Sequence, residues 1–145
     1  MQESRGQSSD SISCFSSMGL DDRILKAISE LGWTRPTLIQ EKAIPLAIEG
    51  RDVLARARTG SGKTAVFAIP IIQRVLEKKQ LDANLQCTRS VILVPTSELG
   101  SQIRDNFEAL CRCCSREVMV AHVTDRTASS SKLLRYLLST ASPVL

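Results

Sequence analysis

The stretch that decides the fold is Ala57-Arg58-Thr59-Gly60-Ser61-Gly62-Lys63-Thr64, near the middle of a chain of 145 residues. It follows a predicted strand at residues 52–57 and opens a predicted helix at residues 63–79. A strand, a glycine-rich turn and a helix in that order are the context of a phosphate-binding loop. Glycines allow successive backbone N–H groups to point inward as an anion nest, and the helix presents its positive end to the same phosphates.

Two side chains of this loop carry the predicted chemistry. Lys63 can reach the β- and γ-phosphates of a nucleotide, and the hydroxyl of Thr64 can ligate Mg²⁺. The alternative is a glycine-rich turn with an unrelated lysine, which we disfavour because a relaxed form of the motif occurs in roughly 1% of unrelated chains of this length. The strict motif begins with glycine, and Ala57 takes that position here.

The rest of the chain predicts an α/β fold. Short apolar runs predict strands at residues 52–57, 90–95 and 117–123, and helical spacing predicts helices at 63–79, 98–113 and 131–138. This alternation is typical of a parallel sheet covered by helices. Residues 143–145 look like the start of a fourth strand, which is a poor domain boundary, so we expect a domain truncated in that strand.

The first fifty residues have a different organisation. Residues 1–13 are polar and predict a flexible leader. Residues 14–50 predict two helices, one starting at Leu20 and ending at Gly32, the other at residues 37–49 and ending at Gly50. Residues 51–145 are then the first part of the α/β domain.

Composition removes several classes of protein. Hydrophobic residues make up 43% and charged residues 23%, which fits one globular core. The longest nearly apolar run is far shorter than a membrane span, and the polar start has no signal-peptide core, so we expect neither a membrane nor secretion. Residues 1–50 carry net charge −2 and residues 51–145 carry +6, which favours an anionic partner. An ordinary solvated surface is the alternative.

The cysteines are expected to be reduced thiols. The chain has five, and Cys111 and Cys114 have C-x-x-C spacing. No second pair follows, and His122 is the only histidine, so we expect no structural zinc, which would need four ligands. His122 alternates within an apolar run and is expected to be structural.

Two further blocks flank the loop. Residues 32–40 read GWTRPTLIQ, in which Thr37 and Gln40 have the spacing of a helix capping box. Residues 95–102 read PTSELGSQ, in which Thr96 is expected to cap a helix whose first N–H groups could meet a phosphate. A plain strand-to-helix turn is the alternative for the second block.

The three blocks, in this order and at these spacings, resemble the DEAD-box RNA helicases over residues 15–145. The resemblance implies part of a RecA-like domain that uses ATP and Mg²⁺ and acts on RNA. It implies that Gln40 reads the adenine edge, as a side-chain amide can by pairing one donor and one acceptor, and that Phe15 packs on the base. The residues it places on the RNA backbone are Pro95, Thr96, Glu98 and Gln102. Two departures weaken that RNA contact: Ser97 replaces the usual Arg, and Gly100 replaces Ala.

Residues 18–21 and 31–47 look nearest to the nucleolar subgroup of this family, which serves assembly of the large ribosomal subunit. A Gly-Gly turn usual in the family is replaced by Thr124-Asp125-Arg126, which also fits that subgroup. The resemblance therefore implies the nucleus, with the nucleolus within it, and pre-ribosomal proteins as further partners.

The Asp-Glu-Ala-Asp box that gives the family its name is nowhere in the 145 residues. We therefore expect this chain to be catalytically incomplete by itself. Two other functions stay open: another P-loop enzyme, such as a small-molecule kinase, or a non-enzymatic nucleotide- or protein-binding product of truncation. A preference for adenine that depends on Gln40 would separate the helicase from the other P-loop enzymes.

Overall fold

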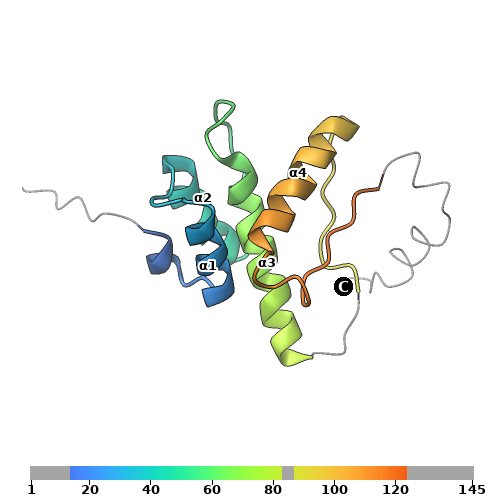
Figure 1. Ribbon diagram of the computed structural model, residues 1–145. Coiled ribbons are helices and arrows are strands. Elements are labelled where there is room, and N and C mark those ends of the chain that lie inside the picture. Colours follow the sequence, from blue (N-terminus) through green and yellow to red (C-terminus); the bar gives the residue numbers. More distant parts are fainter. Residues whose placement is uncertain (1–13, 83–86, 124–145) are drawn as a thin grey trace, which may run out of the picture.

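The computed structural model describes residues 14–82 and 87–123. These residues form a 3-10 helix, η1 (Phe15–Met18), and four α-helices (Figure 1). The α-helices are α1 (Asp22–Glu30), α2 (Leu38–Ile48), α3 (Lys63–Leu81) and α4 (Ser97–Leu110). All four overlap helices that the sequence predicts.

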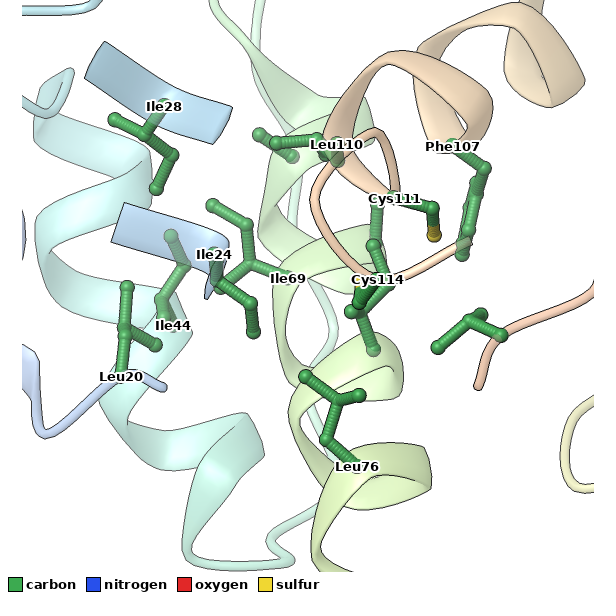
Figure 2. Packing of buried hydrophobic residues seen from close by; sticks show 14 of the residues in the cluster. Leu20, Ile24, Ile28, Ile44, Ile69, Leu76, Phe107, Leu110, Cys111 and Cys114 are labelled. Carbon is green, nitrogen blue, oxygen red and sulfur yellow. The ribbon is translucent and has the colours of Figure 1, made fainter. Parts of the chain in front are cut away.

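Helix α3 organises the packing. It contacts α1, α2 and α4, and Figure 1 shows it between α2 and α4. Apolar residues recur along it every three or four positions, so one stripe reaches the neighbouring helices. The core that results is seen in Figure 2. Its largest fully buried side chains are Ile24, Ile44, Ile69, Ile72, Leu76, Leu110 and Cys114.

Two glycines end α1 and α2 as predicted. Gly32 has φ +72°, its N–H donates to the carbonyl of Ser29, and the N–H of Trp33 donates to the carbonyl of Ile28. This pair of bonds is a Schellman motif, which requires the left-handed backbone that glycine adopts without strain. Gly50, at φ +83°, ends α2 through the same pair of bonds.

The predicted strands are not confirmed. In the described part of the chain, residues 52–57, 90–95 and 117–123 form no strand. Leu54 is fully exposed and Leu93 is 91% exposed, although a strand of a covered sheet would bury both. The apolar pattern shows which residues favour burial, but a strand exists only through backbone hydrogen bonds to a neighbouring strand.

The end of α4 also differs from the prediction. The helix was expected to run to residue 113, but it ends at Leu110, and turns follow to Glu117. The N–H of Cys114 donates to the carbonyl of Cys111, and the N–H of Glu117 donates to the carbonyl of Cys114. The expected strand at residues 117–123 therefore begins inside a turn.

Some expectations lie outside the described residues: the leader at 1–13, the helix at 131–138, residues 124–126 and the strand start at 143–145. Among the helices of residues 14–82 and 87–123, none is both long enough and apolar enough to cross a membrane.

Candidate nucleotide-binding site

The predicted phosphate-binding loop leads directly into α3. Gly60 and Gly62 have φ +80° and +85°, and Gly62 is the N-cap of the helix. A Cβ at Gly62 would collide with the amide nitrogen of Gln40, so the position needs glycine for its backbone angle and for space. The loop also contains a hydrogen-bonded turn, in which the N–H of Ser61 donates to the carbonyl of Arg58 at 3.3 Å.

Lys63 lies across this loop. Its Nζ donates to the carbonyl oxygens of Ala57 and Arg58, both at 2.6 Å. The ammonium group is thus held at the N-terminus of a 19-residue helix, where the helix dipole also favours an anion. A phosphate oxygen could replace these two carbonyls as the acceptor of the lysine protons. Thr64, half-buried, is the next residue of the helix.

The residues present fit a phosphate group bound by this loop. The Oγ of Ser61 is buried and has no hydrogen-bond partner. A buried hydroxyl without a partner costs free energy, which a bound acceptor would recover. Phosphate oxygens are acceptors of the kind that Ser61 Oγ and Lys63 Nζ need. In the part of the chain that the structure describes, there is no group of three or more His, Cys, Asp or Glu that could hold a metal ion.

Gln40 connects the second predicted block to the loop. Its Oε1 accepts from the N–H of Thr37 at 2.9 Å, which is the capping contact expected from the sequence. Its Nε2 donates to the carbonyl of Gly62 at 3.2 Å, and the hydroxyl of Thr37 donates to the carbonyl of Ser61 at 2.8 Å. The two contacts to the loop join residues 22 and 24 positions apart.

The sequence alone did not predict these contacts to the loop. The signal available was the joint presence of the two blocks, but nothing in their spacing places α2 beside the start of α3. Gln40 is only 4% exposed. Oε1 and Nε2 each make one of these hydrogen bonds and have the capacity for a second, so pairing with adenine stays a prediction.

Phe15 belongs to the hydrophobic core. It is 5% exposed, and its ring lies 6.5 Å from that of Trp33, centroid to centroid. The predicted stacking of Phe15 on a base is untested by this arrangement and stays a prediction.

The predicted RNA contacts surround the start of α4. Thr96 caps the helix, since its hydroxyl accepts from the N–H of Leu99 at 3.2 Å. Pro95, Glu98 and Gln102 are exposed, as is Thr96. Glu98 lies in the first turn, where its negative charge stabilises the helix dipole and repels a phosphate.

One cleft of about 710 Å³ connects the starts of α3 and α4. Lys63 and Thr64 line it from α3, and Leu99 and Ile103 line it from α4. Most of the remaining lining is apolar, including Val53, Phe67 and Ile71. The polar end at Lys63 therefore suits a phosphate, whereas the rest of the cleft suits apolar side chains.

Solved structures with a similar fold include a DEAD box protein and an RNA helicase. One is a DEAD box protein from the hyperthermophile Methanococcus jannaschii, with TM-score 0.58 and 44% identity, covering 67% of this chain and 25% of that one. Another is the RNA helicase Prp28 from Chaetomium thermophilum bound to ADP, with TM-score 0.64 and 31% identity. The match covers 85% of this chain and 30% of that one. The class of fold is therefore that of the RecA-like helicase domains, although residues 14–82 and 87–123 of this chain form helices and no strand of the expected sheet.

The sequence comparison gives the family. Residues 37–144 match the DEAD/DEAH box helicases, and the chain belongs to this family. It is similar to the ATP-dependent RNA helicase DBP9 of Pyricularia oryzae, at 47% identity over 133 residues, which is 92% of this chain and 21% of that protein. It is also similar to the probable ATP-dependent RNA helicase ddx56 of Dictyostelium discoideum, at 47% identity over 123 residues. That match covers 83% of this chain and 18% of that protein. The chain spans about a fifth of the length of these curated relatives.

Proposed function

We propose that this chain carries the ATP-binding part of an ATP-dependent RNA helicase. The observation that carries the proposal is the position of Lys63 at the start of α3. Its Nζ donates hydrogen bonds to the carbonyl oxygens of Ala57 and Arg58 in the loop. Residues 57–64 would hold the phosphates of ATP, and Thr64 would give Mg²⁺ one ligand. Bound Mg²⁺ would supply charge neutralisation on the phosphates.

The organisation proposed for the chain has three parts: a leader at residues 1–13, a region at 14–50 that contains Thr37 and Gln40, and the first part of the RecA-like domain at 51–145. The hydrogen bonds from Thr37 and Gln40 to the loop support a joint role of the last two parts in nucleotide binding. Gln40 is proposed to read adenine and Phe15 to pack on the base.

RNA is the proposed substrate of the whole protein. The names of the relatives and the exposed side chains at the start of α4 support this proposal. The resemblance of residues 18–21 and 31–47 to the nucleolar subgroup supports a role in ribosome biogenesis, with pre-ribosomal proteins as partners and the nucleolus as location. A fluorescently tagged chain that stayed outside the nucleus would contradict the proposed location.

The test of nucleotide binding is Lys63→Ala, measured by calorimetry with ATP and Mg²⁺. We expect ATP binding to fall by about tenfold or more, because a hydrogen bond to a charged group contributes about 1.5–3 kcal/mol. The matched control is Lys78→Ala, an exposed lysine in the last turn of the same helix, which should bind ATP like the parent chain. Equal affinity of the Lys63→Ala variant, with its helical content intact, would exclude this loop as the site.

A further inference from the structure

Two cysteines meet at the end of α4, away from the nucleotide loop. Cys111 is the C-cap of the helix, and the N–H of Cys114 donates to its carbonyl at 2.8 Å. A turn closed by such a bond brings the first and fourth Cα atoms within about 7 Å of each other. Disulfides bridge Cα atoms about 4.4–6.8 Å apart, so this turn needs little or no backbone movement to accept one.

Both side chains are buried: Cys111 is 3% exposed and Cys114 is 1% exposed. Figure 2 shows both among the core side chains, together with Phe107 and Leu110. Cys113 lies between them in sequence but is half-buried, and its thiol is directed at Glu30 Oε1, 3.9 Å away. The geometry therefore selects Cys111 and Cys114 from the three neighbouring cysteines.

The environments of the two thiols differ. The neighbouring Cys111 thiol lowers the pKa of Cys114, and so does the nearby Arg23 guanidinium, while burial and the carboxylates of Glu117 and Asp21 oppose this. The Cys114 thiol, together with burial and the nearby Glu108, raises the pKa of Cys111. These opposite shifts belong to the interacting pair, and either thiol can be the one that peroxide oxidises first.

A small molecule can approach Cys111. A cavity of about 250 Å³ is lined by Cys111 together with Glu108, Ser115, Val118, Met119 and Val120. Met119 is 91% exposed, so the cavity borders the surface. Its volume is several times the roughly 30 Å³ that a water molecule takes in the liquid, and hydrogen peroxide is little larger than water.

We propose that Cys111 and Cys114 are an oxidation site, a dithiol that hydrogen peroxide converts to an intramolecular disulfide. One of the two sulfurs attacks a peroxide oxygen, the O–O bond breaks, and the leaving hydroxide takes up the proton of that thiol as water. The resulting sulfenic acid is attacked by the other sulfur, the S–S bond forms, and the sulfenic hydroxyl leaves with the proton of the second thiol as a second water. The two sulfurs lose two electrons, and the peroxide is reduced to two waters.

The sequence offers a direct test, because Arg112 lies between the two cysteines. Trypsin cleaves after Arg104, Arg112 and Arg116, so the cysteines fall into separate peptides, 105–112 and 113–116. The reduced 145-residue chain is treated with hydrogen peroxide, free thiols are alkylated, and the digest is analysed by mass spectrometry. We expect these two peptides to be joined, lighter than their sum by two hydrogen atoms and separable by dithiothreitol. Fragmentation should place the bond on Cys114.

Variants and a denatured sample serve as controls. Cys113→Ser should keep the joined peptides at the parent yield, and Cys111→Ala should lose them. In urea, the preference for Cys114 over Cys113 should disappear, because it depends on the folded turn. Three results would overturn the proposal: no joined peptides in the folded parent chain, a bond placed on Cys113, or loss of the joined peptides in Cys113→Ser. The parent digest and the Cys113→Ser variant test whether Cys111 and Cys114 form the disulfide, even if Cys111→Ala does not fold.

Discussion

Gln40 and Gly62 are joined by a hydrogen bond of 3.2 Å, from the side-chain amide of the first to the carbonyl of the second. Gln40 is the third residue of α2 and Gly62 is the N-cap of α3, so the bond fixes the start of one helix against the start of the other. The same amide accepts from the N–H of Thr37. One side chain therefore caps α2 and positions the loop that precedes Lys63.

Replacing Gln40 with Ala should affect stability and nucleotide binding together. The change leaves the Thr37 N–H and the Gly62 carbonyl without this partner, which should lower the free energy of unfolding by about 1–2 kcal/mol. We also expect weaker binding of ATP and ADP and a smaller gap between adenine and guanine nucleotides. Urea unfolding and calorimetry with both nucleotide types measure the two effects.

The control for this variant is Gln80→Ala, an exposed glutamine near the end of α3. It should change neither quantity. A Gln40→Ala chain that loses stability but keeps its preference for adenine would show that Gln40 acts only as a helix cap.

Gly100 should respond to substitution in a way that depends on His122. Alanine inside a helix is ordinarily about 1 kcal/mol more favourable than glycine. Gly100 is buried in α4, however, and a Cβ there would collide with the imidazole Nε2 of His122 and lie 3.0 and 3.1 Å from two ring carbons. Gly100→Ala should therefore destabilise the parent chain and stabilise a His122→Ala chain. Urea unfolding of the two single variants and the double variant measures this change of sign, and equal effects in both backgrounds would contradict it.

The helices and their ends were largely predictable from the sequence, because capping residues and apolar spacing are local signals. Thr96 at the start of α4, and Gly32 and Gly50 at the ends of α1 and α2, are confirmed. The strands were not confirmed, because strand pairing is non-local and the side chains of Leu54 and Leu93 bury little or no surface here. In the candidate site, the loop and Lys63 were predictable from one continuous motif. The bonds from Thr37 and Gln40 to the loop depend on how α2 packs on α3, which the local sequence does not encode.

Asp21 should make stability depend on pH. Its carboxylate caps α1 through the N–H of Arg23 and pairs with the Arg23 guanidinium at 2.8 Å. The hydrogen bond from the Arg23 side chain holds the pKa of Asp21 below its usual value of about 3.9. Because the folded-state pKa is lowered, the contribution is fully present above the unfolded pKa and is lost as the pH falls through the folded pKa.

Asp21→Ala should therefore lower the free energy of unfolding by about 1 kcal/mol at neutral pH, which is the usual cost of losing a helix cap. The difference from the parent chain should shrink as the pH falls below about 4. Urea unfolding from neutral pH to about pH 3 measures this, with Asp52→Ala as the control at an exposed aspartate. A difference that stays constant over this range would show that the charge of Asp21 is not involved.

The 145-residue chain by itself should not hydrolyse ATP above background, with or without RNA. Thr64 can supply Mg²⁺ with one ligand, and phosphoryl transfer needs further groups that position water and stabilise charge. The Asp-Glu-Ala-Asp sequence is absent from these 145 residues, and the curated relatives are more than four times as long. An arginine finger alone contributes about 10³–10⁵ to the rate in related nucleotidases. Phosphate release from the purified chain, measured with and without single-stranded RNA, is the test, and Lys63→Ala is its control. Turnover that RNA stimulates and that Lys63→Ala removes would show that the chain holds a complete catalytic site.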